Sequence, residues 1–212
     1  MNKLFFTIAI LSATIALASC GSRRNATTGA EPTITNTATT DKGVVINGVR
    51  WATRNVDTPG TFVNNATDAG MFYQWNRREA WNITDREAAN WNTSPATGMT
   101  WERANDPCPP GWRVPTNKEL RSLMDAGSVK AIIDGVQGRL FGTVPYQVFL
   151  PAAGWRDITT GNLSNEGTNG LFWSSTPRGE LDGEFLQFNC SRSLVTTIFR
   201  TSGFSVRCVE ER

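Results

Sequence analysis

The pattern of hydrophobic and polar positions divides the chain into an apolar leader, a polar segment and a long region of short apolar runs. The long region begins at Val44 with two short runs, 44–46 and 49–51, separated by Asn47-Gly48. Asn-Gly supplies the positive φ angles of a two-residue hairpin turn, so this stretch predicts a β-hairpin. The apolar residues of segment 69–75 predict a further strand or buried segment.

A proline-rich crossing and a helix follow in the middle of the chain. Prolines at 107, 109, 110 and 115 fix φ and remove backbone donors, so segment 106–115 is predicted to be extended and rigid. Thr116 and Glu119 have the spacing of a capping box, which predicts that a helix begins there. Leu120, Leu123 and Met124 then form one apolar stripe, and Gly127 ends the helix.

The second half of the chain is predicted to be rich in strands. Residues 129–133 are read as a short second helix that ends at Gly135, and 138–142 as a turn-rich stretch. Apolar or alternating runs follow, separated by Gly, Pro, Asn and Asp, at 147–150, 170–175, 184–189, 194–200 and 204–209. The short spacings leave no room for crossover helices, so these strands are expected to pair antiparallel. The expected fold class is α+β, with an N-terminal hairpin, one or two helices and a strand-rich C-terminal half.

The leader predicts export and lipid attachment. Lys3 is followed by an apolar run over 4–17, which is too short for a permanent membrane span, so residues 1–19 are read as a signal peptide. Leu17-Ala-Ser-Cys20 is similar to a bacterial lipobox, which implies cleavage before Cys20 and a lipid on its sulfur. Gly21 favours the outer membrane under the enterobacterial sorting rule, with the periplasmic or surface face left open. Residues 20–43, rich in Thr, Ala, Asn and Ser, are read as a flexible tether between the membrane and the domain at 44–209.

Composition narrows the class of partner. The whole chain has 21 basic and 19 acidic side chains, and no basic run interleaves with aromatic residues, so nucleic acid is not an expected partner. The expected partners are the membrane, through the lipid on Cys20, and an extracellular glycan or an envelope protein.

Besides Cys20, three cysteines follow the leader, at 108, 190 and 208. Export places them in an oxidising compartment, where two of them are expected to form a disulfide. Cys108–Cys208 is the favoured pair because it would close nearly the whole domain. Cys190–Cys208, which would join two neighbouring strands, is the open alternative.

The polar stretch 76–105 contains Trp81, Trp91 and Trp101, and the first two are each followed by an asparagine, Asn82 and Asn92. Indole faces beside amide groups suit sugar rings, so these five residues are candidate ligand-binding residues on a long loop. The alternative interpretation is that the indoles pack inward and hold the loop on the core.

Several segments resemble the Fibrobacter succinogenes major paralogous domain family of exported bacterial modules. They run from 47 to 56, 69 to 76, 105 to 116, 149 to 154, 172 to 176 and 203 to 208, and they include Asp-Pro-Cys-Pro-Pro-Gly-Trp-Arg-Val-Pro-Thr and Gly-Phe-Ser-Val-Arg-Cys. The resemblance covers 44–209 and implies a C-type-lectin-like fold with Cys108 bonded to Cys208. It implies little about activity, and Cys190 is not part of the resemblance.

Catalytic chemistry is restricted by what the sequence lacks. The chain has no histidine, so Ser-His and Cys-His nucleophile pairs and His-ligated metal sites are excluded. No cofactor is expected. Glu180, Asp182 and Glu184 alternate along one strand and are candidate Ca²⁺ ligands, although a charged sheet edge explains them equally well.

The expected function is therefore a non-catalytic binding domain on a lipid anchor. A structural or assembly component of the envelope is the alternative. A copper oxidase of the sulfatase-modifier type is the third hypothesis, because Gly111–Thr116 and the last strand are similar to segments of those enzymes. That hypothesis needs a pair of cysteines that Cys190 alone does not complete.

Overall fold

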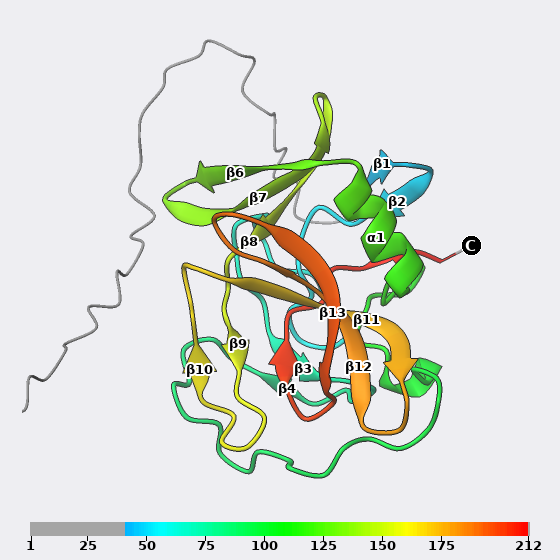
Figure 1. Ribbon diagram of the computed structural model, residues 1–212, viewed down its shortest axis with the longest axis vertical. Coiled ribbons are helices and arrows are strands. Elements are labelled where there is room, and N and C mark those ends of the chain that lie inside the picture. Colours follow the sequence, from blue (N-terminus) through cyan, green and yellow to red (C-terminus); the bar gives the residue numbers. More distant parts are fainter. Residues whose placement is uncertain (1–40, 212) are drawn as a thin grey trace, which may run out of the picture. The chain divides into compact units, whose positions relative to one another are not determined.

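The computed structural model describes residues 41–211, which form an assembly of antiparallel sheets with one α-helix (Figure 1). The predicted signal peptide, Cys20 and most of the predicted tether lie outside the described residues. No helix among residues 41–211 is long and apolar enough to cross a membrane.

Four sheets contain all the strands. The element bounds, in chain order, are β1 Val44–Ile46, β2 Val49–Trp51, β3 Phe72–Gln74, β4 Ala80–Trp81, the 3₁₀ turn η1 Arg103–Asn105, β5 Trp112–Arg113, α1 Asn117–Asp125, β6 Ser128–Ile133, β7 Val136–Thr143, β8 Tyr146–Pro151, β9 Trp155–Arg156, β10 Leu163–Ser164, β11 Gly170–Arg178, β12 Asp182–Phe188, β13 Ser193–Phe199, β14 Gly203–Phe204 and β15 Val209–Glu210.

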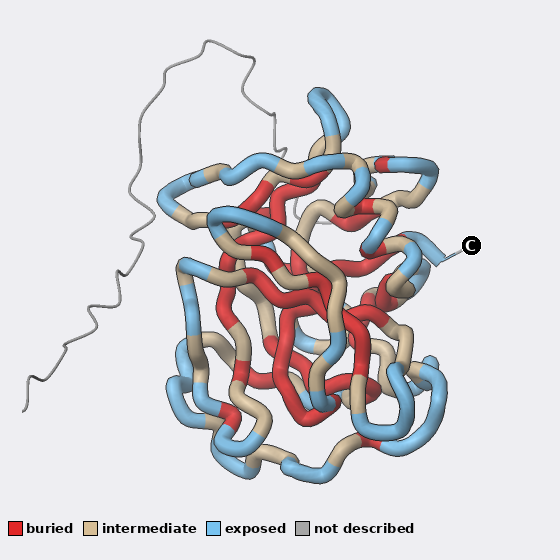
Figure 2. The backbone as a smooth tube through the Cα atoms, viewed as in Figure 1, coloured by how far each residue is buried: buried red, intermediate tan, exposed pale blue. Residues whose placement is uncertain are grey.

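The strand orders are β1-β2-β15-β5, β10-β9-β14-β3-β4, β11-β12-β13 and β6-β7-β8. Every pair of these strands is antiparallel, as the spacing of the apolar runs predicted. The α+β, strand-rich class is confirmed. Figure 2 shows that the inner strands are buried while the connecting loops and hairpin ends are exposed.

The N-terminal hairpin and the helix agree with the sequence. Asn47 and Gly48 have φ values of 48° and 78°, as the turn between β1 and β2 requires. At the start of α1 the Glu119 amide donates to Thr116 Oγ1 at 3.4 Å, and the Thr116 amide donates to Glu119 Oε2 at 2.7 Å. The helix buries Leu120 and Leu123 in the core.

The predicted second helix over 129–133 is wrong, and so is the turn-rich interpretation of 138–142. Both segments are strands, β6 and β7, joined by a hairpin turn at Asp134-Gly135 with φ values of 49° and 81°. Three of the six residues of β6 are β-branched, and Asp-Gly is a strong two-residue turn signal, so local preference and pairing with β7 agree.

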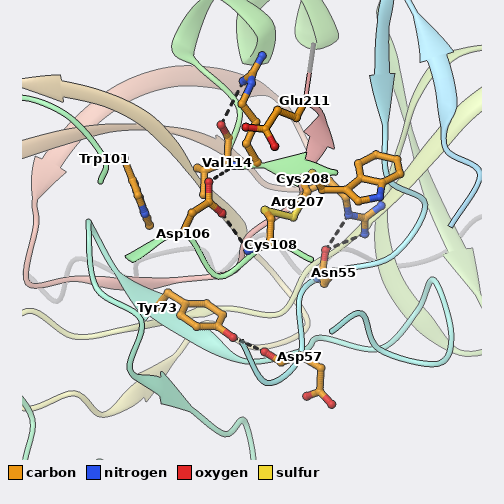
Figure 3. The surroundings of a disulfide bond; sticks show 12 residues. Asn55, Asp57, Tyr73, Trp101, Asp106, Cys108, Val114, Arg207, Cys208 and Glu211 are labelled. Carbon is orange, nitrogen blue, oxygen red and sulfur yellow. Dashed lines mark hydrogen bonds between the residues drawn. A yellow bond between two sulfur atoms is a disulfide. The ribbon is translucent and has the colours of Figure 1, made fainter. Parts of the chain in front are cut away.

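Segment 106–115 contains no helix, as the prolines predicted, but the prediction that it is extended throughout is wrong. The Trp112 amide donates to the Pro109 oxygen at 3.0 Å and Gly111 has a φ of 83°, so the chain turns at Pro110-Gly111. A carboxylate holds this turn. Asp106 Oδ1 accepts from the Cys108 amide at 2.9 Å and Oδ2 accepts from the Val114 amide at 3.1 Å (Figure 3). Burial raises the pKa of Asp106, and these two amide hydrogen bonds oppose that shift. The carboxylate thereby accepts from two backbone amides that have no strand or helix partner in this proline-rich segment.

Cys108 and Cys208 form a disulfide, as predicted, with their Cα atoms 6.1 Å apart (Figure 3). Cys208 directly precedes β15, which lies between β2 and β5 in its sheet. The bond therefore fastens the end of the domain to its middle and to the N-terminal hairpin. Cys190 is an exposed free thiol in the turn between β12 and β13.

Replacing both bonded cysteines by serine is expected to lower the free energy of unfolding by several kcal/mol. The chain-entropy treatment gives about 4.7 kcal/mol for a closed loop of about 100 residues, as an upper value. Chemical denaturation of the Cys108→Ser/Cys208→Ser variant measures the loss. Cys190→Ser is the matched control and should leave the midpoint unchanged; equal midpoints for the double variant and the wild type would contradict this role of the bond.

Candidate functional site

The long loop between β4 and η1 has no strand or helix of its own, and buried arginines from the C-terminal half bind its carbonyls. Arg156, which is fully buried on β9, donates to the Asp85 oxygen at 2.6 Å, to the Gly161 oxygen at 2.7 Å and also to the Asn82 oxygen. One guanidinium thus joins the start of the loop to the turn that follows β9.

Arg200 binds the later part of the same loop. Its Nη1 donates to the Ala96 and Gly98 oxygens, each at 2.8 Å, and its Nη2 donates to the Gly179 oxygen at 2.7 Å. The guanidinium also lies over the Trp75 ring, 4.0 Å from its centroid, which is a cation–π contact.

Side chains of β3 and of the residues just after it bind further backbone groups of the loop, between the two arginine-bound points and beyond them. Gln74 donates to the Asn92 oxygen at 2.7 Å and Arg77 donates to the Ser94 oxygen at 2.9 Å. Asn76 Oδ1 accepts from the Glu102 amide at 2.8 Å. The loop is therefore held at intervals along its length by side chains that reach its backbone, in place of strand pairing.

The guanidiniums are buried without a carboxylate in hydrogen-bonding range. Burial lowers the pKa of both Arg156 and Arg200, and the charges of Asp85 and of Asp182 and Glu180, respectively, oppose that shift. A planar guanidinium carries five donors in a fixed fork, so it can bind several carbonyls that lie apart, whereas an ammonium group has three donors on a single nitrogen.

Trp81 and Trp91 lie together, but inside the loop rather than on an open surface. Their ring centroids are 4.6 Å apart, Trp81 is buried, and the Trp91 indole donates to the Ile158 oxygen at 3.3 Å. A Cβ atom added at Gly161 or Gly203 would lie 2.5 Å or 2.7 Å from the Trp91 ring, so those glycines are the surface on which the indole packs.

Trp101 lies apart from that pair. It is half-buried against Trp75, with ring centroids 5.4 Å apart, and its indole donates to the Asn105 oxygen at 3.2 Å. The structure therefore does not bring the three candidate tryptophans into one ligand surface. Their contacts favour the interpretation in which the indoles hold the loop.

The candidate asparagines have different positions. Asn92 accepts from the Ser94 amide through its side chain and binds Gln74 through its backbone oxygen, so it is part of the loop's internal bonding. Asn82 also caps a turn, by accepting from the Thr84 amide, but in addition it lines a groove.

That groove has a volume of about 600 Å³ and is bounded by five segments of the chain. These are the loop between β2 and β3, the residues after β4, the turn between β6 and β7 with the start of β7, the end of β8 with the two residues after it, and the Glu166-Gly167 turn. Its lining residues are Asp57, Val63, Asn64, Thr67, Asp68, Ala69, Gly70, Met71, Asn82, Ile83, Gly135, Val136, Gln137, Pro151, Ala152, Ala153, Glu166 and Gly167.

The groove combines an apolar wall with acidic and amide groups. Three of its lining residues are acidic and none is a lysine or arginine. The side chains of Asn64, Thr67 and Gln137 line it and make no hydrogen bond with any residue of 41–211. They are therefore available to a ligand without any loss of internal bonding.

Sequence reasoning missed this groove because its segments meet only in the fold, and it missed one wall because it read the hairpin of β6 and β7 as a helix and a turn. Gly135, Val136 and Gln137 reach the groove only because the hairpin turn brings them there. Asp134-Gly135 between two runs with β-branched residues was the signal that could have found them.

The three candidate calcium ligands do not converge. Glu184 is buried and accepts from the Asn117 side chain, Glu180 is exposed, and Asp182 lies at the start of β12. Within residues 41–211 no group of three or more His, Cys, Asp or Glu side chains is placed to hold a metal ion.

Comparison with models of protein families, with curated proteins and with solved structures found no match.

Replacing Arg156 by lysine is expected to release the start of the loop. A lysine keeps the charge but loses the fork, so at least one carbonyl is left without its donor, and the free energy of unfolding should fall by about 2–3 kcal/mol. Amides of residues 82–92 should exchange with deuterium faster, as followed by mass spectrometry. Arg86→Lys, at an exposed ion pair with Glu166, is the control and should change neither quantity measurably; equal exchange in both variants would contradict the role of Arg156.

Proposed function

We propose that the chain is a lipid-anchored protein of the cell envelope whose domain at 44–209 is C-type-lectin-like and binds a glycan or protein ligand without catalysis. The observation that supports this proposal is the groove of about 600 Å³, which is in the size range of ligand sites. Its apolar wall gives contact area, and its amide, hydroxyl and carboxylate groups give directional hydrogen bonds.

The chemistry of the groove favours neutral or cationic ligands. Asp57 and Asp68 line it without a lysine or arginine, so an anionic ligand would meet like charge there; Glu166, which also lines it, is paired with Arg86. Hydroxyl groups of a neutral glycan, or the amides and basic side chains of a polypeptide, have donors for these oxygens. No tryptophan, tyrosine or phenylalanine lines the groove, so a sugar would bind there through polar contacts rather than by stacking.

A structural or assembly role is the second candidate, and the tryptophans favour it. Trp75 and Trp81 are buried, while Trp91 and Trp101 use their indole N–H groups for backbone oxygens of this chain. On this view the loop is a rigid outer surface for contact with other envelope proteins.

The copper-oxidase hypothesis has no support in the arrangement of the cysteines. Cys208 is bonded to Cys108, and Cys190 lies in an exposed turn between β12 and β13. Two neighbouring thiols for a copper ion are therefore not present in residues 41–211.

Groove variants test the binding proposal. Asn64→Ala/Gln137→Ala should leave the midpoint of unfolding unchanged, because neither side chain bonds within the domain, and should weaken ligand binding at least about tenfold, which corresponds to about 1.4 kcal/mol. The probes are an array of neutral glycans and a pull-down from envelope extract with the wild-type domain as bait. Asn162→Ala, an exposed asparagine outside the groove, is the matched control. Failure of every probe to distinguish the groove variant from this control would contradict the proposal.

The lipid anchor has its own test. Cys20→Ser removes the sulfur that would carry the lipid, so a tagged precursor should lose metabolic labelling by palmitate. Cys190→Ser should retain the labelling. Equal labelling of the Cys20→Ser variant and the wild type would contradict lipid attachment at Cys20.

A further inference from the structure

The outer edge of β13 is an unprotected sheet edge. In the three-stranded sheet β11-β12-β13, β13 is the edge strand and β12 is its neighbour; Figure 1 shows the two as one long hairpin in orange and red. Its seven residues, Ser-Leu-Val-Thr-Thr-Ile-Phe, contain no charged residue, no proline and no glycine. Natural edge strands are usually protected by one of these residues, by a bulge or by a covering element.

The register with β12 shows which backbone groups of β13 point outward. The Arg200 amide donates to the Leu181 oxygen at 2.9 Å, and the Asn189 amide donates to the Arg192 oxygen at 3.0 Å. In an antiparallel pair the hydrogen-bonded residues alternate, so the N–H and C=O groups of Ser193, Val195 and Thr197 face away from β12. None of these six groups has a hydrogen-bond partner within residues 41–211.

The edge of β6 provides a comparison. Lys130 lies in the middle of that strand, and the Ser128 oxygen already accepts from Arg139 at 3.1 Å. A lysine on an edge strand is a typical device against pairing with another chain. The β13 edge is longer and has no such residue.

We propose that the β13 edge pairs antiparallel with β13 of a second copy of this chain, about a two-fold axis at Val195. An axis there places Val195 opposite Val195 of the second copy and Ser193 opposite Thr197 of the second copy. Each of the six outward groups then has a partner across the axis, and the two three-stranded sheets become one continuous sheet of six strands. This is an isologous contact, which closes at the dimer.

The side chains permit this register. Leu194 falls opposite Thr196 of the second copy, and Arg192, beside the edge, falls opposite Ile198, so no like charges meet directly. Val195 already packs on the core cluster that contains Leu186 and Phe188, which keeps the centre of the strand in place for pairing. The dimer uses neither the groove nor its lining residues, so this inference stands independently of the proposed ligand.

Substitution at Thr197 tests the pairing. Its N–H points outward, so Thr197→Pro removes a donor from the edge without removing a hydrogen bond to β12. Thr197→Val keeps that donor and is the matched control. Both are made in the predicted mature chain, residues 20–212, with Cys20→Ser, so that neither the apolar leader nor a lipid drives association. Their mass is measured by sedimentation between about 5 and 500 µM.

The wild type and Thr197→Val should shift from monomer to dimer across this range, while Thr197→Pro should remain monomeric. Hydrogen exchange on the wild type gives a second readout that needs no substitution: the amides of Ser193, Val195 and Thr197 should become at least about tenfold more protected at the high concentration. A wild type that stays monomeric at every concentration, or a dimer in which these three amides remain unprotected, would overturn the proposal.

Discussion

The arrangement of the domain depends on buried guanidiniums that bind backbone carbonyls. A stretch with neither helix nor strand leaves its carbonyls without partners, and burying them in that state is unfavourable. Arg156 and Arg200 supply the missing donors from β9 and from the residue after β13. Arg207 does the same for the N-terminal part, by donating to Asn55 Oδ1 at 2.7 and 2.9 Å and to the Ala52 oxygen at 3.2 Å. Full burial lowers the pKa of Arg207 to about 9.

These contacts join distant parts of the chain. Each arginine belongs to the C-terminal third of the sequence and reaches carbonyls or amides that lie about 70 to 155 positions earlier. The disulfide and the position of β15 between β2 and β5 likewise join the end of the described chain to segments much earlier in the sequence. Residues from both halves of the chain therefore surround the loop and the groove beside it. The backbone carbonyls of one half find their hydrogen-bond donors in the other half.

Local signals in the sequence were sufficient for the elements that they encode directly. Asn47-Gly48 fixes its hairpin turn, Thr116 and Glu119 fix the start of α1, and the prolines exclude helix from segment 106–115. The turn at Pro110-Gly111 within that segment was not predicted. The error over 129–133 came from reading a short apolar run as helix although Asp134-Gly135 follows it, because periodicity alone does not separate the two in so short a segment.

The candidate site was less predictable because its parts meet only in the fold. The tryptophan-rich loop was identified, but whether indoles face solvent or the core depends on Gly161 and Gly203, which make room for Trp91. An excess of arginine over lysine, 17 to 4, was visible in the sequence, but the pairing of one guanidinium with three particular carbonyls was not. The groove combines five separate segments, and no single motif specifies it.

The most direct test of the role of the guanidiniums is nuclear magnetic resonance of the arginine side chains. Three-carbonyl binding should slow rotation about the Cζ–Nη bonds and shield the Nη protons of Arg156 and Arg200, giving separate resonances that exchange slowly with water. Exposed arginines such as Arg86 and Arg178 should give averaged, fast-exchanging signals. Fast exchange and averaged signals from Arg156 and Arg200 would contradict the account.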